Sequence, residues 1–156
     1  MKNSTSVDRT SDREVVVTRV INAPASKVFR AWTQAELFRQ WWVPEGAPIT
    51  LVSCEMDVRV GGGYKLVFAY EGNEMPFFGT YREVVPNSRL VWTNDEAGDA
   101  GQVTTVTFEE INGKTRVVMH DLYPSKEALD AAVASGSLEG TVAQFEQLEE
   151  FVAARD

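Results

Sequence analysis

The sequence predicts an α+β domain in which a curved antiparallel sheet wraps around a long C-terminal helix. Two observations predict this fold. The hydrophobic period changes from 3.6 to 2 after the aromatic-rich residues 28–42, which indicates helices followed by strands. Several strand-like runs separated by turn signals then precede one amphipathic stretch near the C-terminus. Because a sheet and a helix in this order can enclose an interior space, we expect a container for an apolar molecule.

The composition indicates one globular domain. The chain has 156 residues, of which 44% are hydrophobic and 24% charged, close to the averages for soluble proteins. We expect a single domain at residues 14–156 after a flexible polar tail at residues 1–13, which lacks the apolar core of a signal peptide. Later apolar runs fall short of the ~20 residues of a transmembrane helix. We therefore expect a cytoplasmic protein with no membrane partner.

Charge and cysteine content exclude several classes of site. The net charge of -8 would repel a phosphate backbone, so we expect no nucleic-acid partner. Cys54 is the only cysteine, which rules out an intrachain disulfide and fits a reducing compartment. One histidine and one cysteine are too few for an ordinary zinc site. We predict neither a metal nor a cofactor.

The N-terminal half of the domain begins with a strand and two short helices. Residues 14–22 are rich in β-branched side chains and predict a strand that is covered on both faces. Pro24 suits a first helical position, and apolar residues then recur at helical spacing. Thr33 and Glu36 form a capping-box pattern that predicts the start of a second, separate helix.

A run of strands and a final helix complete the chain. The predicted strands lie at residues 50–57, 63–70, 77–85, 89–94, 102–109 and 115–122. Asn112-Gly113 is the strongest hairpin signal, and other turns are expected at residues 71–74, 86–88 and 95–101. Ser125 can cap a helix that Gly136 interrupts. The longer helix after it carries one apolar stripe of Leu138, Val142, Phe145, Leu148 and Val152. This order of elements resembles the helix-grip architecture.

Five short motifs in order resemble a known family. They are the run VFRAWT at 28–33, Trp41-Trp42-x-Pro44, Asp57-x-Arg59-x-Gly61-Gly62-x-Tyr64, GTYREVVP at 79–86 with Arg89-Leu90, and TVTF at 105–108 before Gly113-x-Thr115. Together they resemble the family related to the C-terminal domain of the activator of heat-shock protein 90 ATPase, in the START-like (SRPBCC) superfamily, over residues 15–153. The resemblance implies a helix-grip fold with a cavity between sheet and final helix. It also implies relatives that bind hydrophobic ligands or act with chaperones.

Aromatic and aliphatic residues are the candidates for the cavity wall. Adjacent Trp41 and Trp42 cannot both face one core, so one should face the cavity mouth or a partner. Phe77 and Phe78 point to opposite faces of a strand, and we assign Phe78 to the interior. The predicted apolar ligand-binding residues are Trp41, Trp42, Tyr64, Leu66, Phe68, Phe78, Trp92, Leu138, Val142 and Phe145.

Three polar residues are candidates for orienting a ligand's polar end, namely Arg59, Tyr81 and His120. Arg59 lies two residues from Asp57 on the same strand face, where a structural ion pair is the alternative. His120 has a surface position as its alternative, and its neighbour Asp121 should point to the other face of the strand.

Three functions are weighed. The first is non-enzymatic binding of a small hydrophobic molecule between sheet and C-terminal helix. The second is a protein-interaction module that engages a chaperone or a second copy of the chain through the Trp41-Trp42 loop. The third, which the superfamily resemblance implies, is an enzyme of the cyclase or hydrolase kind using His120 or a buried acid. We assign no catalytic residue, because no nucleophile, metalloprotease or dinucleotide motif is present.

Overall fold

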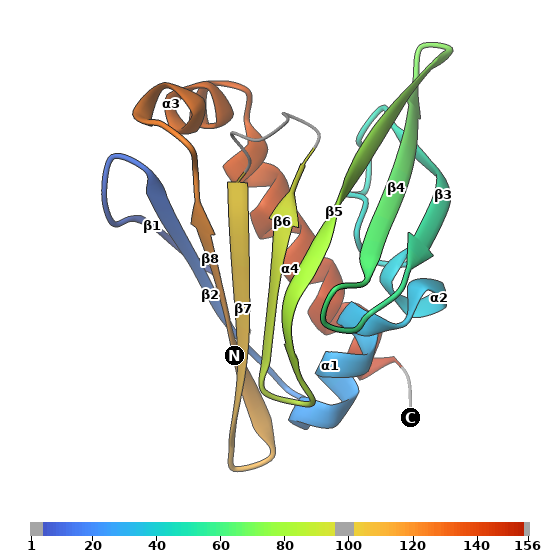
Figure 1. Cartoon of the computed structure of the whole chain (residues 1–156). Helices are drawn as coiled ribbons and strands as arrows, with labels where there is room; N and C mark the ends of the chain where they lie inside the picture. Colours follow the sequence, from blue (N-terminus) through green and yellow to red (C-terminus); the bar gives the residue numbers. More distant parts are fainter. Residues whose placement is uncertain (1–4, 96–101, 155–156) are drawn as a thin grey trace.

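The computed structural model describes residues 5–95 and 102–154, and its architecture is the predicted helix grip (Figure 1). One eight-stranded sheet has the strand order β1-β2-β8-β7-β6-β5-β4-β3, and neighbouring strands are antiparallel. In chain order the elements are β1 (Ser6–Arg9), β2 (Glu14–Ile21), α1 (Ala25–Thr33), α2 (Ala35–Phe38), β3 (Thr50–Met56), β4 (Gly63–Tyr70), β5 (Asn73–Val85), β6 (Arg89–Asn94), β7 (Gln102–Ile111), β8 (Lys114–Leu122), α3 (Lys126–Ala134) and α4 (Ser137–Ala153). The predicted fold class is confirmed.

The first strand differs from the expected N-terminal tail. Residues 6–9 pair with β2 at the edge of the sheet, and Val7 packs against the core. Arg9 Nη2 donates a hydrogen bond of 2.8 Å to Asp130 Oδ1 on α3. An edge strand is paired on one side only and tolerates polar residues, so its composition resembles that of a tail. The expectation of a flexible tail is therefore wrong for these four residues.

The two short helices are separate, but the predicted capping box does not form. Thr33 Oγ1 donates to the backbone carbonyl of Phe29 at 2.9 Å instead of capping the next helix. This bond to a carbonyl four residues back is a common alternative for threonine in a helix. Gln34 is extended, with φ -103° and ψ 119°, and separates α1 from α2 without a side-chain cap.

The hairpin turns follow from positive backbone angles. Asn112 and Gly113 have φ 54° and 80°, which confirms the predicted two-residue turn. Glu71 and Gly72, with φ 49° and 82°, make a similar turn between β4 and β5. Because this turn needs only two residues, β5 begins at Asn73, four residues earlier than predicted. The turn expected at 95–101 lies almost wholly outside the described residues.

The predicted start of the first C-terminal helix and its interruption at Gly136 are confirmed. Ser125 caps α3 by accepting a hydrogen bond from the Ala128 amide at 3.1 Å, and Gly136, with φ 85°, separates α3 from α4.

Within the described part of the chain, no helix has the length and apolar character needed to cross a membrane.

Helix α4 covers only part of the sheet's concave face. Phe145, Leu148 and Val152 are its buried hydrophobic residues, and α4 packs against α3 and α1 and, within the sheet, against β2 and β1. Buried Arg19 on β2 donates from Nε and Nη2 to Glu149 Oε1 on α4 at 3.0 and 2.8 Å. Figure 1 shows α4 crossing behind the sheet at an angle to the strands. Because α4 is fixed to the β1–β2 side, space remains over the strands farther along the sheet.

Candidate functional site

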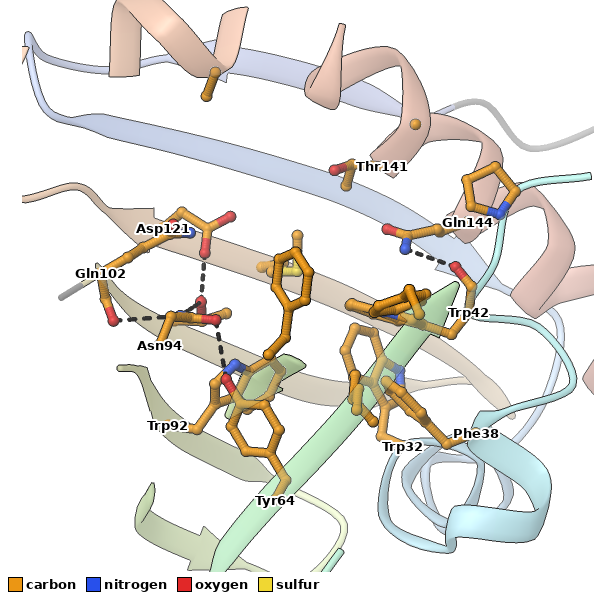
Figure 2. A pocket seen from close by; sticks show the side chains of 18 of the residues that line it. Trp32, Phe38, Trp42, Tyr64, Trp92, Asn94, Gln102, Asp121, Thr141 and Gln144 are labelled. Carbon is orange, nitrogen blue, oxygen red and sulfur yellow. Dashed lines mark hydrogen bonds between the residues drawn. The ribbon is translucent and has the colours of Figure 1, made fainter. Parts of the chain in front are cut away.

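That space is a cavity of about 500 Å³ lined by strands β3 to β8, helices α1 to α4 and the loop after α2 (Figure 2). The volume is within the range of about 300–1,000 Å³ that is usual for small-molecule sites. Its walls consist of an aromatic cluster, a β4–β5 wall, a polar end and a face of α4.

The aromatic cluster contains Trp32, Phe38, Trp42 and Trp92. Phe38 and Trp42 are stacked with ring centroids 4.6 Å apart, and Trp32 lies 6.0 Å from both Trp42 and Trp92. Trp32 Nε1 is the one buried side-chain polar atom of the described residues without a hydrogen-bond partner. Such rings offer a large apolar surface with few rotatable bonds. The cluster is therefore a rigid apolar wall.

The structure separates the two adjacent tryptophans, as the sequence requires. Trp41 is 1% exposed, and its indole N–H donates to the Ala31 carbonyl at 2.9 Å. Trp41 therefore belongs to the core and does not line the cavity, whereas Trp42 does. The loop carrying Trp42 is held to α4, because Gln144 Nε2 donates to the Trp42 carbonyl at 2.7 Å. Gln147 Nε2 likewise donates to the Trp41 carbonyl at 2.8 Å.

The wall formed by β4 and β5 contains four of the predicted residues, and it corrects the prediction for Phe78. Tyr64, Leu66 and Phe68 share the inner face of β4 and line the cavity. Phe77 lines it too and meets Phe68 edge to face at 5.4 Å. Phe78, the residue assigned to the interior, points to the outer face and is 40% exposed.

The register of β5 explains this reversal. Leu66 pairs with Phe77 and Tyr64 with Gly79, so the odd-numbered residues of this part of β5 share the inner face. A Cβ atom on Gly79 would overlap the Thr93 carbonyl oxygen, so only glycine allows β5 to pass β6 this closely. Two further predicted residues, Tyr81 and Trp92, lie on the inner face and line the cavity.

A hydrogen-bonded series of side chains forms the polar end of the cavity (Figure 2). The Tyr64 hydroxyl lies 3.1 Å from Asn94 Oδ1, and Asn94 Nδ2 donates to Thr104 Oγ1 at 3.1 Å and to the Gln102 carbonyl at 3.2 Å. Thr104 Oγ1 in turn donates to Asp121 Oδ1 at 2.5 Å. Strand register brings these residues together, because Asn94 pairs with Gln102 and Thr104 with Asp121.

Asp121 is the titratable group of this end. Its burial raises the pKa of the carboxyl, and hydrogen bonds from Thr104 and Gln102 partly oppose that rise. Among the residues that the structure describes, no cation forms an ion pair with Asp121. Asp121 is not among the residues predicted to line the cavity, although strand alternation places it on the same face as Met119. That apolar inner face was the signal that could have identified it.

Two polar candidates lie outside the cavity. His120 is on the outer face of β8, where its Nε2 lies 2.7 Å from Glu14 Oε2, and this contact lowers the pKa of Glu14. Arg59 is exposed and pairs with Asp57 at 2.9 Å. The alternative interpretation, a structural ion pair, is confirmed for Arg59. Neither side chain can orient a molecule inside the cavity in this structure.

The apolar stripe of α4 is also not the cavity wall. Phe145 is fully buried in the core, Leu138 packs at its margin, and Val142 is half-buried away from the cavity. The cavity instead meets the neighbouring face of α4, which presents Gly140, Thr141 and Gln144. The physical reason is that the larger residues of the stripe are buried where α4 packs against the core. They therefore do not face the cavity.

Within the described residues, no group of three or more His, Cys, Asp or Glu side chains is placed to hold a metal ion. Cys54 is half-buried on β3, and desolvation raises the pKa of its thiol. The residues that line the cavity offer apolar contact and hydrogen bonding to a guest.

Solved structures with the same fold come from several bacteria. A protein from Nitrosomonas europaea is 24% identical over 94% of this chain and 97% of its own, with a TM-score of 0.84. A protein from Rhodobacter sphaeroides is 20% identical over 98% of this chain and 100% of its own, with a TM-score of 0.88. A protein from Chromobacterium violaceum is 25% identical over 91% of this chain and 98% of its own, with a TM-score of 0.77. A search of curated proteins found no match.

Residues 22–153 match the family model described as "Activator of Hsp90 ATPase homolog 1-like protein". This match covers most of the domain, including all the cavity walls described above. It agrees with the resemblance that the five sequence motifs indicate. The chain therefore belongs to the family of activator of Hsp90 ATPase homolog 1-like proteins.

Proposed function

We propose that this protein binds a small, largely apolar molecule in the cavity and does not convert it chemically. The observation that carries the proposal is the unfilled volume of about 500 Å³ between the sheet and the helices. A core in which side chains filled this space would have argued against a container. The aromatic cluster supports the proposal further, because rigid rings bury a guest at little entropic cost.

A co-chaperone-like interaction module is the second candidate, which the family description suggests. Its predicted contact surface was the Trp41-Trp42 loop. Trp41 is buried and Trp42 lines the cavity, so these rings do not form an exposed apolar patch. This placement favours the container over the interaction module.

An enzymatic function has one observation in its favour, the buried carboxyl of Asp121 in the cavity wall. Its direct hydrogen-bond partners are the side chains of Thr104 and Gln102, and neither is an acid or a base at neutral pH. His120, the expected acid or base, lies on the opposite face of the sheet. Binding without conversion therefore has the stronger support.

Native mass spectrometry of the protein purified from its own cells tests the proposal. We expect an additional non-covalent mass, of a molecule small enough for the cavity, that is lost under denaturing conditions. A Trp42→Ala variant should retain less of this mass, whereas the outward-facing control Phe78→Ala should retain as much as the unmodified chain. Recovery of a protein partner with no small molecule would favour the interaction module instead.

A further inference from the structure

Three side chains at the polar end of the cavity, those of Asn94, Thr104 and Tyr64, have acceptors within the protein for their hydrogen-bond donors. Asn94 donates its two amide hydrogens to Thr104 Oγ1 and the Gln102 carbonyl, and Thr104 donates its hydroxyl hydrogen to Asp121. The Tyr64 hydroxyl lies 2.8 Å from a backbone carbonyl of β6, which can accept its hydrogen. What these three side chains leave for a guest is therefore acceptor capacity.

Asp121 can accept more hydrogen bonds from a guest than the other side chains of the polar end. A carboxylate can accept about four hydrogen bonds, and the side chains of Thr104 and Gln102 supply two of them. The described residues that line the cavity include no Lys, Arg or His. Burial of a carboxylate without a cation is unfavourable, so a cationic guest would remove a cost that the empty protein bears.

The surroundings of Asp121 also favour a cation. The chain has a net charge of -8, and a negative field raises the local concentration of cations. Figure 2 shows the aromatic rings of Tyr64 and Trp92 beside Asn94 at this end. Aromatic faces attract organic cations when these approach within about 6 Å of the ring centre.

We propose that the Asp121 end of the cavity binds the protonated amine of an otherwise apolar ligand. The ammonium group would donate to the Asp121 carboxylate, and the apolar body would lie against the aromatic cluster of Trp32, Phe38, Trp42 and Trp92. This inference rests on the proposed function and narrows the ligand class to apolar amines.

Three probes with one carbon skeleton test the inference by isothermal titration calorimetry at pH 7. They are 4-phenylbutylamine, 4-phenylbutan-1-ol and 4-phenylbutyrate. We expect the amine to bind about tenfold more tightly than the alcohol. A hydrogen bond between charged groups is stronger than a neutral one, and the difference in free energy corresponds to about tenfold in affinity. The carboxylate should bind most weakly, since it would meet Asp121 as a like charge.

Two aspartate variants separate the local contact from net charge. Asp121→Asn should weaken amine binding about tenfold and leave alcohol binding within about twofold. Asp8→Asn changes the net charge equally but lies exposed on β1, so both affinities should stay within about twofold.

The outcomes distinguish this inference from the proposed function. Equal binding of amine and alcohol, tighter binding of the carboxylate, or an amine preference that survives Asp121→Asn would overturn the amine site and leave the container intact. If none of the three probes binds, the container and the amine site both fail. The probe series on the unmodified chain decides the question even if Asp121→Asn does not fold.

Discussion

Substitutions of Gly140 on α4 test whether the cavity is empty. A large apolar side chain at this position should stabilise the protein if the space is empty and destabilise it if the space is filled. This glycine lines the cavity, and a Cβ atom there would meet only Pro44 Cγ, at 3.9 Å. That distance is ordinary van der Waals contact, so the backbone accepts a side chain. Gly140→Leu places an apolar side chain in the cavity, and Gly140→Ala is the matched control for helix propensity.

The two variants differ mainly in buried apolar surface. Replacing glycine inside a helix by alanine stabilises by about 1 kcal/mol, and leucine has nearly the same propensity. Burial of a leucine side chain adds up to about 1.5–3 kcal/mol when empty space receives it. We therefore expect Gly140→Leu to be about 1–2 kcal/mol more stable than Gly140→Ala. For a chain of this length, that difference raises the melting temperature by about 2–8 °C.

Urea unfolding followed by tryptophan fluorescence measures the free energy of unfolding of each variant. Titration of both variants with 4-phenylbutan-1-ol should also show weaker binding to Gly140→Leu, because the leucine occupies volume that the probe needs. If α4 and the sheet were packed together without a void, leucine would overpack the interface. Overpacking costs about 1–3 kcal/mol, so a leucine variant less stable than the alanine variant refutes the reasoning.

Three further predictions concern buried polar groups, and urea unfolding checks each. Trp41→Phe should lower the free energy of unfolding by about 1 kcal/mol more than Trp32→Phe. The Trp41 substitution leaves a buried carbonyl of α1 unpaired, whereas the Trp32 substitution removes a donor that has no partner. Equal losses of stability would contradict this. Arg19→Ala should destabilise by about 3–5 kcal/mol by leaving Glu149 buried without its cation, and the double variant with Glu149→Gln should recover part of the loss. Folding raises the pKa of Asp121, so the folded state keeps a proton that the unfolded state has lost, and stability falls as pH rises above the ordinary value of 3.8. The stability of Asp121→Asn relative to the unmodified chain should thus grow between pH 4 and 7, and a constant difference would argue against it.

Periodicity and turn chemistry predicted the fold because each signal is local. The Asn112-Gly113 turn and the Ser125 cap depend on neighbouring residues alone, and both form as expected. The edge strand β1 was missed because pairing at an edge needs little apolar surface. The capping box at Thr33 failed because a competing local bond to Phe29 was available.

The site was harder to predict because its position depends on how distant elements pack. Strand alternation placed Tyr64 and Leu66 on one face but could not say whether Phe77 or Phe78 would join them. That choice depends on the register between β4 and β5. Likewise, the apolar stripe of α4 was identified correctly, but the sequence does not reveal that Gly140 lies on the face toward the cavity.

The polar end shows the same limit. Asn94, Thr104 and Asp121 come from three different strands, and no local pattern joins them. Each of these residues taken alone is an ordinary polar residue in a strand. Only the pairing of β6 with β7 and of β7 with β8 brings them into one network.

The four indole N–H signals of this chain allow the most direct test of whether a guest enters the cavity. In a ¹H–¹⁵N correlation spectrum of the full chain titrated with 4-phenylbutylamine, the signals of Trp32, Trp42 and Trp92 should move, because these rings line the cavity. The signal of Trp41, which donates to Ala31 inside the core, should move least. If all four signals stayed unchanged at saturating probe, or if Trp41 moved as much as the other three, no guest would be occupying this space.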